Sequence, residues 1–147
     1  MTVRTNRGER RPSGPPGPPD PAVGTPEQFV ADFFASFTRD VLGEEDVETV
    51  HDRYHTEDVV EVVDGNRLDR DRLVAHLRPV RRNLGDFSFD VHEAVRSGNR
   101  VAARFTVHGV VRGNPIDTEI AMFGEFTEDG RLRRSHQFTR TLTAAQD

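Results

Sequence analysis

The chain has 147 residues, which is enough for one domain with a single hydrophobic core. Its 25 acidic residues outnumber 20 basic ones and give a net charge of −5, which argues against a surface built for nucleic acid. The absence of cysteine excludes disulfides, thiolate nucleophiles and cysteine-ligated metal sites. No apolar stretch is long enough for a secretory signal or a membrane span, so we expect a cytoplasmic protein without membrane contact.

Proline and glycine dominate the N-terminal segment. The sequence GPPGPP at residues 14–19 is too short to hold a collagen triple helix, and little apolar surface surrounds it. We therefore expect a disordered tail over residues 1–24, with docking to a partner as an alternative role. An α+β domain is expected over residues 25–143, followed by a short tail over residues 144–147.

The first half of this domain shows helical signals. Thr25 is a favoured N-cap and Pro26 a favoured first helical residue, and phenylalanines follow every fourth position at Phe29, Phe33 and Phe37. A short second helix over residues 44–54, a strand over residues 59–63 and a third helix capped by Asp69 are expected next. His51 and His55 have a spacing that metal ligands use, but the second lies past the predicted helix end, so we expect no metal site.

From residue 86 the apolar period changes from 3.6 residues to two. Short turn-forming segments separate four runs at residues 87–95, 100–113, 115–126 and 131–142, and Asp129-Gly130 is a strong hairpin signal. These runs predict an antiparallel meander. Helices followed by strands predict an α+β fold in which the helices cover one face of a curved sheet.

Strict alternation assigns strand residues to the two faces of this sheet. It places Arg134, His136 and Phe138 inward beside Leu132, and it places Glu93 inward on the first long strand. Unpaired polar groups are costly to bury, so these side chains are expected to be paired, hydrated or at a pocket mouth. A cross-strand ion pair between Glu93 and Arg134 is one explanation, and a polar pocket wall is the other.

The outer face is expected to keep apolar residues. Alternation leaves Phe123 on the same side as Glu119 and Glu125, and Val110 on the same side as Arg112. Exposed apolar side chains among charged ones are typical of a subunit interface. We therefore expect a homodimer formed through the outer face of the sheet.

The order of elements, together with FDVHEAVRSGNRVAARFTVHG and FTEDGRLRRSHQFTR, resembles the SnoaL-like branch of the nuclear transport factor 2 superfamily. The resemblance covers roughly residues 25–143. It implies a cone-shaped half-barrel, with three N-terminal helices packed on a curved, mainly antiparallel sheet around a deep pocket, and frequent dimerisation through the sheet. Members of the superfamily include polyketide cyclases, ketosteroid isomerases, dehydratases and non-catalytic binding proteins, so the site must decide the function.

The resemblance also suggests catalytic residues. Ketosteroid-isomerase-like members carry an acidic proton-shuttling base at the end of the strand before the third helix, and Asp64 occupies the matching position. Desolvation at a pocket wall would raise the pKa of Asp64, whereas the alternative is an ordinary turn at Asp64-Gly65. Tyr54 or His136 would stabilise or protonate the enolate, and the alternatives are a core tyrosine and a structural histidine.

The expected ligand is a small hydrophobic carbonyl compound such as a polyketide or a steroid-like metabolite. Isomerase-type or cyclase-type proton transfer on it requires a base and a donor but no cofactor. Gln137 stands where such cyclases often carry an aspartate, so a non-catalytic homodimeric binding protein for an apolar ligand is the alternative. The residues expected to bind the ligand are Phe33, Phe37, Glu93, Phe105, Met122, Arg134 and Phe138.

Overall fold

The structure is a computed structural model that describes residues 3–6 and 17–142. The helices are α1 (Pro26–Val41), α2 (Val47–Tyr54) and α3 (Arg70–Asn83). The strands are β1 (Val3–Asn6), β2 (His55–Val63), β3 (Asn66–Asp69), β4 (Leu84–Ser97), β5 (Arg100–Val111), β6 (Asn114–Phe126) and β7 (Leu132–Leu142). The expected α+β class is confirmed, and no helix of the described ranges is long and apolar enough to span a membrane.

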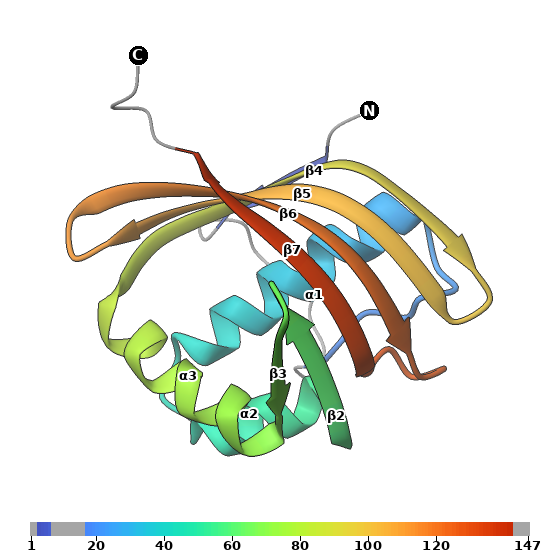
Figure 1. Ribbon diagram of the computed structural model, residues 1–147, viewed down its shortest axis with the longest axis horizontal. Coiled ribbons are helices and arrows are strands. Elements are labelled where there is room, and N and C mark those ends of the chain that lie inside the picture. The colour runs from blue at the N-terminus through green and yellow to red at the C-terminus, as the bar shows by residue number, and fades with distance from the viewer. Residues whose placement is uncertain (1–2, 7–16, 143–147) are drawn as a thin grey trace.

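The strands form one sheet in the order β1-β4-β5-β6-β7-β2-β3. β4 to β7 are the expected antiparallel meander, whereas β2 runs parallel to β7 and turns back into β3. Figure 1 shows that the sheet curves around α1 and that all the helices lie on its concave side. The result is a cone-shaped half-barrel.

Aromatic side chains of α1 fill the narrow part of the cone. The Thr25 hydroxyl accepts a hydrogen bond from the backbone N–H of Gln28 and so caps the helix as expected. Phe29 and Phe33 are fully buried and meet Phe126 of β6 edge-on, with ring centroids 4.9 and 5.3 Å away. Such edge-on packing is a favoured geometry for aromatic rings, so α1 is fixed tightly against the sheet.

The N-terminal residues differ from the expected disordered tail at residues 3–6 and 17–24. β1 pairs antiparallel with β4, and the carbonyl oxygen of Pro21 accepts a hydrogen bond from Arg96 at 2.7 Å. Pro19 packs so closely on the β6–β7 turn that a Cβ on Gly130 would clash with its carbonyl oxygen. The other residues of the expected tails, 1–2, 7–16 and 143–147, lie outside the described residues.

A β-bulge in β7 reverses the predicted faces of that strand. Leu132 lies opposite Phe126 and Arg134 lies opposite Glu125, so Arg133 is an extra residue in the ladder. Beyond it the alternation is shifted by one position, and this shift buries Ser135 and Gln137. The predicted inward orientation is therefore wrong for three residues, which are exposed on the outer face: Arg134, His136 and Phe138.

A second bulge has the same effect on β4. Val91 lies opposite Phe105 and Glu93 opposite Arg104, so His92 is the extra residue. Glu93 is consequently exposed, and the prediction that it faces inward is wrong. Its carboxylate accepts a hydrogen bond from Arg104 Nε at 2.9 Å, so the expected ion pair with Arg134 is replaced by one within the outer face.

Candidate active site

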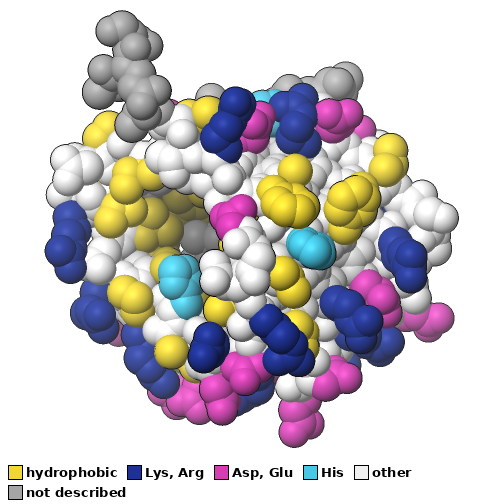
Figure 2. Space-filling view, viewed as in Figure 1, with side chains coloured by type: hydrophobic (Ala, Val, Ile, Leu, Met, Phe, Trp, Pro, Cys, Tyr) yellow, Lys and Arg dark blue, Asp and Glu magenta, His cyan; other side chains and the backbone are white. Residues whose placement is uncertain are grey.

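The inward side chains at one end of the cone, which we call the open end, are only partly buried. Phe105 and Met122 are fully buried, whereas Val107 and Ile120, the next inward residues of the same strands, are only partly buried. Figure 2 shows a hollow between the sheet and the helices, with hydrophobic side chains along its border. The border of this hollow is therefore suited to contact a small apolar molecule.

Glu61 is a carboxylate on the concave face of β2, at the boundary between the filled core and the open end. Its exposed fraction is only 8%, and its Oε1 accepts hydrogen bonds from Ser135 Oγ at 3.1 Å and from Gln137 Nε2 at 2.9 Å. Burial raises the pKa of Glu61 above its usual range, and the Ser135 bond offsets only part of this rise. Burial thus makes the ionised form of Glu61 a stronger base than a solvated carboxylate.

His55 faces the other oxygen of this carboxylate, with its Nε2 3.7 Å from Glu61 Oε2. The His55 Nδ1 lies 2.8 Å from the carbonyl oxygen of His51. Because a carbonyl can only accept, Nδ1 carries the proton of the neutral ring and Nε2 presents a lone pair to Glu61. Burial lowers the pKa of His55 to about 3, and the Phe37 ring packs edge-on against it with centroids 4.9 Å apart. His55 is therefore neutral at physiological pH.

A second histidine supports the first. The rings of His51 and His55 are stacked, with centroids 4.0 Å apart and planes 3° from parallel. His51 Nδ1 lies 3.5 Å from a carboxylate oxygen of Asp52. Arg70 donates one hydrogen bond to each oxygen of that carboxylate, both at 2.8 Å. His51 Nε2 is buried without a hydrogen-bond partner among the described residues.

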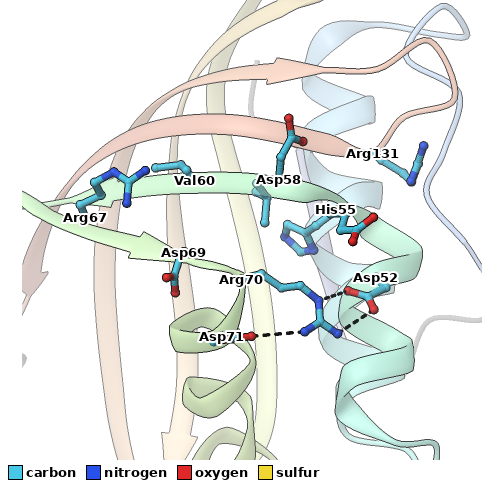
Figure 3. A pocket seen from close by; sticks show the side chains of 11 residues that line it. Asp52, His55, Asp58, Val60, Arg67, Asp69, Arg70, Asp71 and Arg131 are labelled. Carbon is cyan, nitrogen blue, oxygen red and sulfur yellow. Dashed lines mark hydrogen bonds and ion pairs between the residues drawn. The ribbon is translucent and has the colours of Figure 1, made fainter.

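Beside His55 lies a charged cleft of about 790 Å³, drawn in Figure 3. The cleft lies between the β2–β3 hairpin and helices α2 and α3, and the Arg70–Asp52 ion pair crosses it. Charged side chains from these elements dominate its lining, so it is suited to water rather than to an apolar ligand. His55 therefore lies between a polar cleft and the buried Glu61. Residues 3–6 and 17–142 contain no cluster of three or more side chains that could hold a metal ion.

The three residues expected to be catalytic do not meet at this site. Asp64 is exposed in the β2–β3 turn, where hydrogen bonds from Thr139 lower its pKa, so the expected rise in pKa is wrong. Tyr54 is fully buried in the core and donates to Asp40 Oδ2 at 2.6 Å. His136 stacks on Phe138 on the outer face, with ring centroids 5.2 Å apart. The turn and core alternatives therefore describe Asp64 and Tyr54 better.

The expected ligand-binding residues are also divided. Phe33, Phe105 and Met122 are at most 1% exposed, so they belong to the filled core rather than to an open pocket wall. Phe37 is partly buried and contacts the candidate site through His55. The remaining three expected residues lie on the outer face: Glu93, Arg134 and Phe138.

Glu61, His55 and Gln137 were not predicted as site residues. Glu61 stands in the run VVEVV, where both faces of the strand are equally apolar and alternation carries no information. Strict alternation from Leu132 predicts that Gln137 lies on the outer face, because the bulge at Arg133 has no local signal in the sequence. The useful signal was the charge of Glu61 within a strand of valines, since a buried carboxylate in such a strand needs partners.

The geometry defines a cone-shaped α+β domain in which a buried carboxyl group faces a buried histidine. A family model for the SnoaL-like domain matches residues 30–135, and the chain belongs to this family. One relative, an uncharacterized protein of Schizosaccharomyces pombe, is 27% identical over 117 residues that cover 79% of this chain and 86% of the relative.

Solved structures share the fold at low sequence identity. AusH from Aspergillus nidulans is similar with a TM-score of 0.62 and 17% identity, over 78% of this chain and 82% of AusH. Wild-type IdmH, described as a putative polyketide cyclase from Streptomyces antibioticus, is similar with a TM-score of 0.59 and 16% identity, over 79% of this chain and 92% of IdmH. These similarities support the architecture of a ketosteroid-isomerase-like cone, within which the side chains of each member set the chemistry.

Proposed function

We propose that this protein catalyses proton transfer at a carbon next to a carbonyl group of a small apolar molecule, with Glu61 as the general base. The observation that carries the proposal is the position of Glu61, whose buried carboxyl group with a raised pKa is bonded to Gln137, the strand neighbour of buried Met122, and Met122 is followed on the inward face by the partly buried Ile120. Proton abstraction from such a carbon needs a carboxylate more basic than a solvated one, and burial shifts the pKa of Glu61 in that direction.

The two oxygens of the Glu61 carboxylate have different neighbours and different roles in the proposed reaction. Ser135 and Gln137 hold Oε1, while Oε2 faces His55 and keeps its lone pairs for chemistry. Ionised Glu61 takes the proton from the substrate carbon, and the electron pair of the C–H bond moves to the carbonyl oxygen as an enolate. The lone pair of His55 Nε2 then accepts a hydrogen bond from the protonated carboxyl group and stabilises it.

The proton on Glu61 has two productive fates. In an isomerisation it returns to a different carbon of the enolate, so the double bond moves and no atom is gained or lost. In a cyclisation the enolate carbon attacks a second carbonyl of the same molecule, and the proton goes to the alkoxide that forms. Both reactions leave Glu61 ionised for the next turnover, and neither step needs a further reactant.

The substrate class follows from the walls of the open end. Partly buried apolar residues border the inward face there, among them Phe34, Leu84, Val107 and Ile120. An enolisable carbonyl compound with a large apolar skeleton, such as a polyketide or a steroid-like metabolite, fits this surface. The description of IdmH as a putative polyketide cyclase supports this choice for a member of the same fold.

Replacing Glu61 with Gln tests the proposal because glutamine keeps the shape of the side chain and removes the base. We expect turnover of a responsive member of a panel of enolisable ketones and aromatic polyketides to fall about a hundredfold or more, with ligand binding retained. Glu57→Gln, a change at an exposed residue of the same strand, is the matched control. Unchanged turnover in Glu61→Gln would remove the glutamate from the mechanism.

A non-catalytic binding protein is the second candidate function. It is favoured by the hydrogen bonds from Ser135 and Gln137, which already satisfy one oxygen of Glu61 without a substrate. In that case the wild-type protein binds apolar carbonyl compounds from the same panel and turns over none of them. The two candidates therefore differ in one measurement on the unmodified protein.

We also infer that two copies of the chain associate through the outer face of the sheet. Val95, Phe123 and Phe138 are 67%, 68% and 57% exposed, and they flank or line an apolar groove of about 570 Å³ on this face. Apolar side chains of this size are rarely left in water without a partner. The cytoplasmic location expected from the sequence stays a prediction.

A further inference from the structure

The β2–β3 hairpin carries Glu61 but is joined to the rest of the sheet on one side only. β3 is the outermost strand, and β2 pairs with β7 continuously only from Val60 to Val63. Between His55 and Val60 the register shifts, so the pairing is interrupted there. The position of Glu61 therefore depends on a short parallel ladder.

Asp64 extends this ladder at the tip of the hairpin. Its backbone N–H donates to the carbonyl oxygen of Gln137 at 3.0 Å, and its carboxylate accepts hydrogen bonds from the Thr139 backbone N–H at 2.9 Å and from the Thr139 hydroxyl. Figure 1 shows this tip beside β7. Asp64 and Glu61 thus bind successive residues of one face of β7, namely Ser135, Gln137 and Thr139.

Packing contributes little at the tip. Asp64, Gly65, Asn66 and Arg67 are all exposed, and a Cβ added to Gly65 would meet no atom within 4 Å. Asp64 also has a positive φ of 50°, which is uncommon outside glycine and persists where surrounding bonds support it. The hydrogen bonds to β7 are therefore the main attachment of the tip.

We propose that Asp64 is a positioning residue, a latch that fastens the β2–β3 hairpin to β7 and so keeps Glu61 against Ser135 and Gln137 and away from water. The consequence for chemistry rests on the proposed function of Glu61, but the latch itself does not. If the tip separates from β7, water reaches the Glu61 carboxyl group and the burial that makes it a strong base is lost. Asp64 then acts through Glu61 without touching the substrate.

Two substitutions weaken the hydrogen bonding between Asp64 and Thr139, one at each partner. Asp64→Gly removes the carboxylate and suits the positive φ, and Thr139→Val removes the hydroxyl while keeping the backbone N–H and the shape. Thr139→Ser restores a hydroxyl and serves as the rescue. Thr127→Val is the matched control, because it removes the equivalent threonine-to-aspartate bond from Thr127 to Asp129 in the β6–β7 turn.

The measurement is the carboxyl ¹³C titration of Glu61, assigned with Glu61→Gln, together with amide hydrogen exchange in β2. In Asp64→Gly and Thr139→Val we expect the titration midpoint of Glu61 to move down toward that of a solvated glutamate. The amides of Val62 and Val63 should exchange about tenfold faster or more, which is the sign of local opening. Thr139→Ser and Thr127→Val should match the wild type in both measurements.

A titration of Glu61 that is unchanged in both opening variants would overturn the latch. This holds whatever their melting temperatures, because a purely structural role for Asp64 changes stability but leaves the titration in the folded state unaltered. If Asp64→Gly fails to fold, the milder Thr139→Val with its serine rescue decides the question alone. Failure of the proposed function is seen elsewhere, in the turnover of Glu61→Gln.

Discussion

Gln137 Nε2 donates a hydrogen bond to Glu61 Oε1 at 2.9 Å, across the parallel pair of β7 and β2. The amide also lies 3.2 Å from Ser135 Oγ, so the carboxyl group, the amide and the hydroxyl form one buried network. In the sequence, Gln137 favours a non-catalytic protein, because an amide cannot act as a base. In the fold it holds the base, and a donor at this place is what a carboxylate without a neighbouring arginine requires.

Gln137→Leu should therefore destabilise the protein and raise the pKa of Glu61 further. A hydrogen bond to the ionised form favours that form, so its loss favours the proton. A buried carboxyl group that loses one donor costs about 1–3 kcal/mol of unfolding free energy, measured by urea denaturation near neutral pH. Met122→Leu, a volume-conserving change at the neighbouring buried position on β6, is the control and should cost less. A Glu61 titration that moves down in Gln137→Leu would contradict the assigned bond.

The raised pKa of Glu61 also predicts how stability depends on pH. The folded state holds the proton more tightly than the unfolded state, whose glutamate has the ordinary value of 4.5. Stability is therefore complete below that value and declines as the pH rises through the folded pKa, by about 1.4 kcal/mol for each unit of elevation.

Glu61→Gln should remove this decline, because glutamine never ionises. The check is urea unfolding of both proteins at several pH values from about 4 to about 8, starting below the ordinary pKa of glutamate. The difference in unfolding free energy between variant and wild type should grow in favour of the variant as the pH rises. A difference that is constant with pH would mean that Glu61 titrates alike in both states.

The contact between Pro19 and the β6–β7 turn predicts a cost at Gly130. Gly130→Ala places a Cβ against the Pro19 carbonyl oxygen and also strains a residue with φ of +88°. Gly65→Ala bears nearly the same strain, with φ of +84°, but meets no atom within 4 Å. Both should lose stability by about 1 kcal/mol from the backbone, and Gly130→Ala should lose a further 1–3 kcal/mol, on the order of other overpacking changes. Equal melting temperatures for the two variants would show that the N-terminal segment yields without cost.

Phe123→Glu should prevent association of two copies through the outer face. The phenylalanine is 68% exposed on the sheet, and a charge there opposes burial against a partner. Val23→Glu changes a residue that is 67% exposed on the N-terminal segment and is the matched control. Light scattering at micromolar concentration should give a dimer mass for the wild type and Val23→Glu and a monomer mass for Phe123→Glu. A monomeric wild type would refute the interface.

The sequence by itself determined the elements and the fold class, because their signals are local. The Thr25 cap, the phenylalanines four residues apart in α1 and the Asp129-Gly130 turn each act within a few residues, and the structure confirms the helices, the meander and the α+β cone. Periodicity of side chains along a helix, or along an uninterrupted stretch of a strand, is set by backbone geometry, so the sequence alone reveals it.

Only the tertiary structure decided which side chains form the site. The extra residues at His92 and Arg133 exist because of how neighbouring strands pair, and after each of them the inner and outer faces exchange. For the same reason His136 lies on the surface and Gln137 is buried, which is the reverse of what strict alternation predicts. Glu61 could not be assigned to a face within VVEVV until β2 was seen to pair in parallel with β7, because pairing between strands distant in sequence depends on long-range packing that no local pattern encodes.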